Sequence, residues 1–238
     1  MNKPIVDSLA PVTLVGGGEA SSGDLAEAMA LAPLCVAADG GAHLALAAGV
    51  EVTAVIGDLD SIGDALDQIP TKRRHLIAEQ DSTDFDKALR HICAPVVLAV
   101  GFTGGRIDHH LAALHVLLAY PDRPCVLLGA HEITFLCPPR VALPLAEGDV
   151  VSLFPMGSVA GTSQGLRWDI EGLHFDPMVK IGTSNIALGP VALTMDAPAM
   201  LVVLPRARLR AVMRVLASAP PAARWPARAT QYKDPPRS

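Results

Sequence analysis

The first 130 residues alternate short apolar runs with segments rich in Ala, Leu and Glu, and this alternation limits the possible folds more than any other feature. The apolar runs cover residues 12–15, 34–38, 52–56, 75–78, 96–100 and 125–128, with a loop and usually a helical pattern after each. Strands and helices that alternate at this spacing form parallel βαβ units with right-handed crossovers. Ligands of such sheets bind outside the carboxyl ends of the strands, where we expect the functional loops.

After residue 130 the pattern changes to short apolar runs separated by Gly and Pro, at 133–136, 150–154, 181–188, 191–195 and 200–204. Runs of this kind, without a long helix between them, are typical of a small antiparallel β-sandwich. We therefore predict an α/β chain: a parallel-sheet, Rossmann-like nucleotide domain over 1–129 and a β-sandwich domain over 130–218. Pro, Arg and Ala dominate the remainder, so 219–238 is predicted to be a flexible tail.

Composition excludes several classes of protein. The net charge of −5 argues against a nucleic-acid coat or a binder of anionic membranes, because both need a basic face. No apolar run reaches membrane-spanning length, and the N-terminus lacks the pattern of a signal peptide, so we expect a cytoplasmic location. The scattered cysteines form no C-x-x-C pair and are expected to be reduced core thiols: Cys35, Cys93, Cys125 and Cys137.

Two aspartates, Asp58 and Asp60, follow the apolar run that ends at Ile56. Gly57 breaks the strand, and side chains two residues apart in an extended segment point the same way. Two converging carboxylates repel each other, so the arrangement favours a bound cation, and Mg²⁺ suits carboxylate oxygens best. The alternative is an ordinary acidic loop in which Ser61 caps the next helix.

The stretch Gln80–Leu89 combines a loop with a helix start. Phe85, Ala88 and Leu89 share one helical face that must pack on the sheet, and Asp84 and Lys87 lie together at its border. We expect these two to be functional, whereas Asp86 points away and is expected to face solvent. The alternative for Asp84 and Lys87 is a surface ion pair, with Ser82 or Thr83 only capping the helix.

Glycine-rich turns follow two other strands. In Gly104–His109, free backbone N–H groups and Arg106 could hold phosphate oxygens, while Asp108 is either a ligand or a first-turn residue that satisfies the helix dipole. Gly16–Gly18 matches neither the Walker signature nor the dinucleotide fingerprint, and it is a secondary phosphate-binding candidate.

These motifs in this order resemble the thiamine pyrophosphokinase family. The resemblance rests on Asp39-Gly40-Gly41, Gly57-Asp58-Leu59-Asp60-Ser61, 81–88 and 104–109, and it continues through 165–168 and 183–185. It covers about residues 11 to 205. The family implies a homodimer with the active site at the subunit interface, and transfer of pyrophosphate from ATP to thiamine with release of AMP.

The resemblance also implies site residues. A Mg²⁺ and phosphate cluster would comprise Asp39, Asp58, Asp60 and Asp84; nucleotide or transferring-group contacts would come from Gly40, Gln80, Thr83, Lys87, Arg106 and Asp108; and thiamine would be held by Ser184 and Asn185. Trp168 is a candidate aromatic wall for the thiamine cation, or else a core residue. Ile186 is a departure, because an acidic residue often follows the Ser-Asn pair in bacterial members.

In this scheme the thiamine hydroxyl attacks the β-phosphorus of ATP, and positioning and charge neutralisation supply most of the acceleration. The sequence assigns no general base. Two other functions stay open: a pyrophosphokinase that acts on another heterocyclic alcohol, such as a pterin, and a catalytically silent dimer that binds thiamine or nucleotide.

Overall fold

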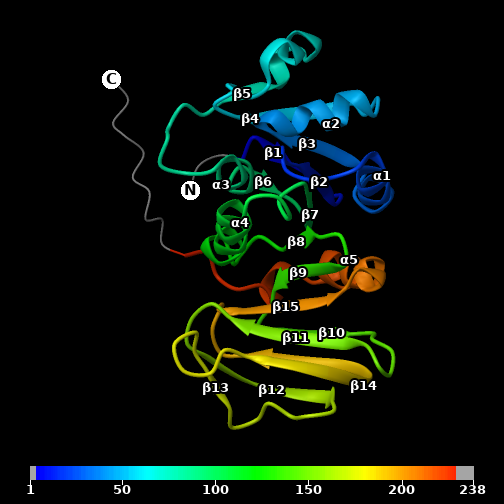
Figure 1. The fold of residues 1–238 in the computed structure, drawn as a ribbon, viewed down its shortest axis with the longest axis vertical. Helices are drawn as coiled ribbons and strands as arrows, with labels where there is room; N and C mark the ends of the chain where they lie inside the picture. Colours follow the sequence, from blue (N-terminus) through cyan, green and yellow to red (C-terminus); the bar gives the residue numbers. More distant parts are fainter. Residues whose placement is uncertain (1–3, 229–238) are drawn as a thin grey trace.

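A computed structural model of the chain describes residues 4–228 (Figure 1). Its parallel strands lie in the order β8-β7-β2-β3-β4-β5. They are β2 (Val12–Val15), β3 (Leu34–Ala38), β4 (Val52–Gly57), β5 (Arg74–Leu76), β7 (Val97–Val100) and β8 (Cys125–Leu128). The chain winds outward from β2 to β5 and then returns to the other side of β2, so the winding direction reverses between β2 and β7. Ligands of open α/β sheets bind at such a switch point.

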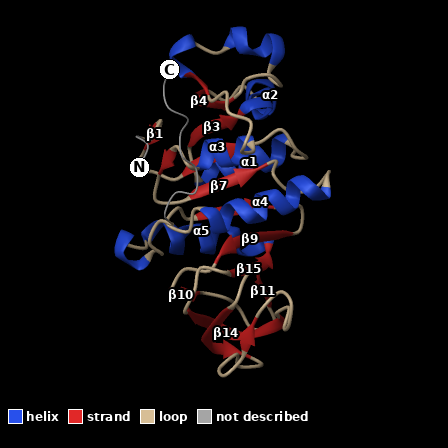
Figure 2. Ribbon diagram, turned by 90° about the vertical axis from the view of Figure 1, so that its left-hand side faces the viewer, coloured by secondary structure: helices blue, strands red, loops and turns tan. Residues whose placement is uncertain are grey.

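Helices cover both faces of this parallel region (Figure 2). The helices are α1 (Ser22–Leu31), α2 (Ala42–Ala47), α3 (Asp84–Leu89) and α4 (Ile107–Ala119). Adjacent residues of a strand point to opposite faces: Leu14 packs with Phe85 of α3, whereas Val15 packs with Leu25 of α1. Both faces are buried, which explains the uninterrupted apolar runs of these strands.

The antiparallel strands continue the same sheet. β9 (Glu132–Leu136) pairs antiparallel with β8, and β15 (Met200–Pro205), β11 (Val150–Pro155), β14 (Thr183–Met195), β12 (Val159–Leu166) and β13 (His174–Phe175) follow in that order. β10 (Arg140–Leu143) pairs with β14. The hydrogen bonds between β8 and β9 therefore continue the sheet across the predicted boundary at 129/130. The division into two domains stays a prediction.

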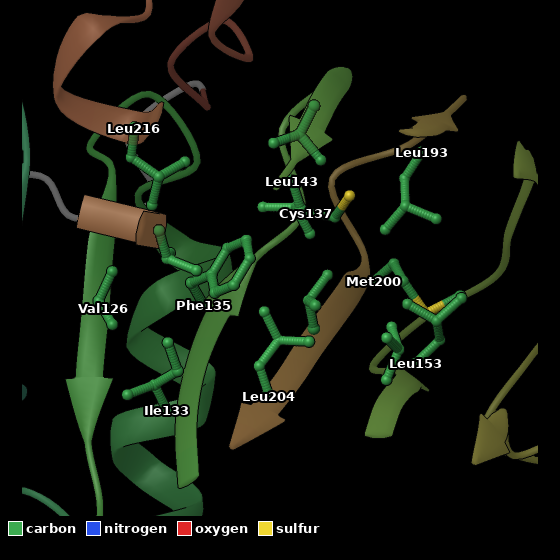
Figure 3. Packing of buried hydrophobic residues seen from close by; sticks show 14 of the residues in the cluster. Val126, Ile133, Phe135, Cys137, Leu143, Leu153, Leu193, Met200, Leu204 and Leu216 are labelled. Atoms are coloured by element: carbon green, nitrogen blue, oxygen red, sulfur yellow. The ribbon is translucent and has the colours of Figure 1, made fainter. Parts of the chain in front are cut away.

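A single apolar cluster joins these strands to α5 (Leu209–Ser218) (Figure 3). Phe135 of β9 is fully buried in it, together with Val126 of β8, Leu153 of β11 and Leu216 of α5. The cluster thus crosses from the last parallel strand into the antiparallel region, which fixes the two parts of the sheet to each other.

Some elements differ from the sequence expectation. β14 is one long strand, although the apolar pattern indicated two runs, because Gly189 and Pro190 lie inside it without ending it. β10 and β12 were not expected. A small separate sheet pairs β1 (Val6–Asp7) with β6 (Ile92–Cys93), and short 3₁₀ turns occupy Asp39–Gly41, Gly63–Gln68, Thr71–Arg73, Arg206–Arg208 and Pro221–Ala223.

The described part of the predicted tail, 219–228, lies against the body of the molecule. The Trp225 Nε1 group donates to the Cys137 carbonyl at 2.8 Å, and Arg224 donates to the Pro95 carbonyl at 3.0 Å. Residues 229–238 lie outside the described range. All four cysteines are free thiols, and only Cys93 is exposed, contrary to its expected place in the core. Within residues 4–228, no helix is long and apolar enough to cross a membrane.

Candidate active site

Three carboxylates meet at the carboxyl ends of β3 and β4. Asp39, Asp58 and Asp60 each offer an oxygen, and these oxygens all lie within 4.8 Å of one another. Asp39 is almost fully buried, Asp58 is partly buried and Asp60 is exposed, so the group reaches solvent at Asp60. This is the convergence expected when neighbouring parallel strands end at one edge of a sheet.

The backbone takes unusual conformations to place these groups. Asp39 has a φ of 42° and Leu59 a φ of 64°, both in the left-handed region that non-glycine residues rarely occupy. Gly57 allows a close approach, because a Cβ there would lie 2.8 Å from the Asp39 Cβ and 3.2 Å from Asp84 Oδ1. Strain of this kind collects at functional sites, where surrounding structure maintains it.

Lys87 lies beside the carboxylates. Its Nζ donates to Asp58 Oδ2 at 2.8 Å and to Asp84 Oδ1 at 3.3 Å, and its side chain is only 2% exposed. The hydrogen bond from Lys87 is the main reason that the pKa of Asp58 is below its usual value. Burial alone would lower the pKa of Lys87, but the bond to Asp58 and the charges of both carboxylates outweigh burial and raise it.

The pKa of Asp84 is raised above its usual value. Burial raises this pKa most, and the nearby Asp58 and Asp39 carboxylates raise it further against the opposing charge of Lys87. Four carboxylates surround one ammonium group, so an added divalent cation would relieve their repulsion.

The site also has acceptor atoms without donors. Asp39 Oδ1 and Asp58 Oδ1 are buried and accept no hydrogen bond from any described residue. Unsatisfied buried oxygens are rare, and each requires an explanation such as a bound ion or water. Converging carboxylate oxygens are the donor set that a hard divalent cation takes, so the residues present fit a metal ion.

A cavity of about 430 Å³ opens next to this edge, at the carboxyl ends of β7 and β8. Its lining includes Glu19, Ser21, Asp24, Thr103 and Gly104. The glycine turn 16–18 is near both: a Cβ on Gly17 would lie 3.7 Å from Gly40, the neighbour of Asp39, and Glu19, which directly follows the turn, lines the cavity. The cavity and the carboxylates thus occupy one edge of the sheet.

The comparisons with known proteins agree on one family. Residues 25–127, which contain all four aspartates and Lys87, match the family described as thiamin pyrophosphokinase, catalytic domain. This part of the chain is similar to the catalytic domain of thiamine pyrophosphokinases.

Relatives with this name occur in plants. The chain is 34% identical to thiamine pyrophosphokinase 1 of Arabidopsis thaliana and 31% identical to thiamine pyrophosphokinase 2 of Oryza sativa. Each alignment covers 55% of this chain and 56% of the relative, so the chain spans about half the length of these relatives.

Solved structures of the family share the fold. The thiamin pyrophosphokinase from Geobacillus thermodenitrificans superposes with a TM-score of 0.68 at 23% identity, covering 82% of this chain and 96% of that one. The enzyme from Candida albicans gives a TM-score of 0.68 at 14% identity, covering 86% and 94%. The mixed α/β fold is therefore that of known thiamine pyrophosphokinases, through the antiparallel region as well.

Gln80 and Gly40, which were also expected in this site, lie close to it. Gln80 Nε2 donates to Asp58 Oδ2 at 3.3 Å, whereas Thr83 accepts a hydrogen bond from the Asp86 N–H and so caps α3. Gly40 packs against Ser61, whose backbone N–H donates to Asp39 Oδ2 at 3.1 Å. The role of Ser61 was not expected, since the sequence suggested only a helix cap.

Arg106 and Asp108 pair with each other instead. Their side chains are 72% and 60% exposed and lie 2.5 Å apart at the start of α4. Among the described residues, neither has a hydrogen bond or ion pair with the carboxylate group. The pairing lowers the pKa of Asp108 and raises that of Arg106.

The residues expected to hold thiamine lie at the other end of the molecule, on β14 and beside β12 (Figure 1). Asn185 is buried, and its amide bonds both the N–H and the carbonyl of Trp168, at 3.2 and 2.7 Å. Trp168 itself is 56% exposed, so the core alternative for it is wrong. Ser184 is exposed.

One expectation about α3 is also wrong. Asp86 is only 5% exposed, although its position on the helical wheel indicated solvent. Arg90 and Tyr120 cover its side chain. Because Tyr120 lies at the end of α4, the residue pattern of α3 alone could not predict this contact.

Proposed function

We propose that this protein transfers the pyrophosphate group of ATP to thiamine, giving thiamine diphosphate and AMP. The observation that carries the proposal is the carboxylate group of Asp39, Asp58 and Asp60 beside buried Lys87, in the part of the chain that matches the catalytic-domain family. Relatives named thiamine pyrophosphokinase support the choice of acceptor.

Asp39, Asp58 and Asp60 would hold a divalent cation, and Mg²⁺ is proposed because it commonly binds through carboxylates and phosphates together. When bound, the cation neutralises charge on the transferring phosphates. Lys87 adds a second positive charge at the site, and Asp84 keeps its ammonium group oriented. Positioning and charge neutralisation are the main requirements of phosphoryl-type transfer.

The reaction exchanges one bond for another. An oxygen–phosphorus bond forms between the thiamine hydroxyl and the β-phosphorus of ATP, and the bond from that phosphorus to the α-phosphate oxygen breaks. AMP leaves with the electron pair of the broken bond, and the hydroxyl proton passes to solvent or buffer.

The nucleoside part of ATP is proposed to occupy the cavity at the ends of β7 and β8, with its phosphates directed past the Gly16–Gly18 turn toward the carboxylates. Supporting this, Glu19 and Asp24 line the cavity, which suits hydroxyl and amino donors better than phosphate. Arg106 and Asp108 are exposed at the start of α4, where a phosphate could replace Asp108 as the partner of Arg106.

The thiamine contacts are proposed to come from a second copy of the chain. β14, which carries Ser184 and Asn185, lies far along the sheet from β3 and β4, which lead to the carboxylates (Figure 1), and this supports a homodimer whose active site combines two protomers. The cytoplasmic location expected from the sequence stays a prediction.

Incubation with ATP, Mg²⁺ and thiamine tests the function. We expect AMP and thiamine diphosphate in equal amounts and no ADP, with little AMP when a pterin alcohol replaces thiamine. ADP as the product, a preference for the pterin, or tight thiamine binding without turnover would each refute the proposal.

A further inference from the structure

Arg90 joins α3 to the loop that leads into it. It lies at the end of α3, and its side chain is 16% exposed. One terminal nitrogen lies 2.7 Å from Glu79 Oε1, and the other lies 3.3 Å from both Asp86 Oδ1 and Ser82 Oγ. Burying a charge is costly unless it is paired, and Arg90 is paired on both sides.

Glu79 shapes the loop that leads into α3. Its Oε2 accepts the backbone N–H groups of Asp81 and Ser82 at 2.9 and 3.2 Å, and its Oε1 accepts the Ser82 hydroxyl. Burial alone would raise the pKa of Glu79, but the bonds from Ser82 and Arg90 outweigh it and lower that pKa. The carboxylate therefore stays charged and keeps the turn closed.

Asp86 fixes the rotation of α3. It accepts the Tyr120 hydroxyl at 2.7 Å, in addition to its pair with Arg90, and so ties α3 to the end of α4. Lys87 is the next residue along the helix. Because neighbouring helical side chains point in directions about 100° apart, holding Asp86 toward Tyr120 directs Lys87 toward Asp58.

The same loop reaches the carboxylates directly. Gln80 lies between Glu79 and Asp81, and its side chain donates to Asp58 Oδ2, the oxygen that also accepts the bond from Lys87. Arg90 touches none of the carboxylates that would hold the cation, but it bonds to the loop that carries Gln80 and to the helix that carries Lys87.

We infer that Arg90 is a positioning residue for the cation site, acting through Glu79 on the loop of Gln80 and through Asp86 on Lys87. Only the catalytic consequence of this inference rests on the proposed function. Its structural part, that Arg90 sets the geometry around Asp58, holds for any divalent cation bound there.

The test compares Arg90→Met with Arg90→Lys, and with Arg73→Met as a matched control. Arg73 also pairs with a glutamate, Glu51, which lies at the amino end of β4, whereas the loop before α3 begins at the carboxyl end of β4. Hydrogen exchange is measured at residues 77–83, with β7 as the reference for global unfolding. Calorimetry measures Mn²⁺ binding without nucleotide, and steady-state kinetics measures AMP release.

In Arg90→Met we expect faster exchange at Asp81 and Ser82 with unchanged exchange in β7. We also expect about 10-fold weaker Mn²⁺ binding, as for loss of outer-shell support of a metal site, and about 10²-fold lower kcat with little change in the KM for thiamine. Arg90→Lys keeps the positive charge but loses the two-pronged guanidinium group. Its exchange rates, Mn²⁺ affinity and kcat should therefore lie between those of Arg90→Met and wild type.

Exchange and Mn²⁺ affinity equal to those of Arg73→Met would overturn the inference. The inference also fails if, in both Arg90→Met and Arg90→Lys, hydrogen exchange rises as much in β7 as in the loop. Arg90 would then only stabilise the fold as a whole. A wild type that releases no AMP would refute the proposed function alone, because the exchange and Mn²⁺ measurements do not depend on turnover.

Discussion

Lys87 is nearly inaccessible to solvent, yet its ammonium group is surrounded by more negative charge than it can balance. Asp58 and Asp84 take its hydrogen bonds, and Asp39 and Asp60 add two more carboxylates close by. When no cation is bound, the fold therefore holds these carboxylates close together although they repel one another. A site of this kind exchanges stability for the ability to bind a cation.

Asp84→Asn should stabilise the metal-free protein at neutral pH. The folded-state pKa of Asp84 is raised, so its contribution to stability is present below the unfolded pKa of about 3.9 and is lost as pH rises through the folded value. The side chain is 37% exposed, so solvent screening limits the gain to about 1 kcal/mol or less, or about 2–4 °C in Tm.

Thermal unfolding in EDTA measures this effect. The gain should shrink as pH falls below about 4, where both forms are uncharged at this position. A loss of stability at pH 7 would show that the ion pair with Lys87 outweighs the burial and repulsion of Asp84.

Asp60→Asn should leave the fold intact and lower AMP formation by at least about 10²-fold, because it removes a ligand of the proposed cation site. Asp60 is exposed, so the substitution creates no cavity. The control is Asp64→Asn, an exposed aspartate of the next turn, which should keep full activity. Activity near wild type in Asp60→Asn would remove Asp60 from the site.

At the scale of elements, α3 carries Asp84 and Lys87 of the site on only six residues, Asp84–Leu89. A helix this short is unstable alone, so its position depends on its cap and on tertiary contacts. The cap is Thr83, and the tertiary contacts are those of Phe85 with the sheet and of Asp86 with Tyr120.

Thr83→Ala should therefore destabilise the protein by about 1 kcal/mol, or about 2–4 °C in Tm, whereas Thr83→Ser keeps the hydroxyl and most of the stability. Circular dichroism melts of the two variants provide the comparison. Equal melting temperatures for Thr83→Ala and Thr83→Ser would show that the capping hydroxyl does not stabilise α3.

The sequence predicted the elements that local patterns determine. The apolar face of Phe85, Ala88 and Leu89 places α3 correctly to within a residue or two, and Gly57 marks the end of β4. The convergence of Asp58 and Asp60 was predicted, but for a different reason: the segment is not extended there, because Leu59 has a left-handed φ of 64°.

Other features depend on partners far along the chain. The burial of Asp86 is caused by Tyr120, and the roles of Arg90 and Glu79 appear only when the loop folds back on α3. β12 is rich in polar residues and Gly, so its place in the sheet comes from pairing with β14 and not from propensity.

At the scale of the whole molecule, one continuous sheet carries two groups of functional candidates at its opposite ends (Figure 1). The far end also exposes large apolar side chains, among them Trp168 at 56%, Met178 at 90% and Ile181 at 62%. Exposed apolar side chains in this number suit an interface with a second copy.

A shared active site predicts complementation between inactive protomers. Asp60→Asn and the double variant Trp168→Ala, Ser184→Ala should each be nearly inactive at low thiamine, and mixed dimers should recover part of the activity because one site then has both intact halves. Sedimentation verifies that mixed dimers form. Mixed dimers without recovered activity would place both halves of the site in one protomer.

The most direct measurement is anomalous diffraction at the manganese edge from crystals grown with Mn²⁺. We predict a peak within bonding distance of carboxylate oxygens of Asp39, Asp58 and Asp60, and its loss in crystals of Asp60→Asn. A protein that releases AMP in Mn²⁺ but shows no manganese between these three carboxylates would contradict the account.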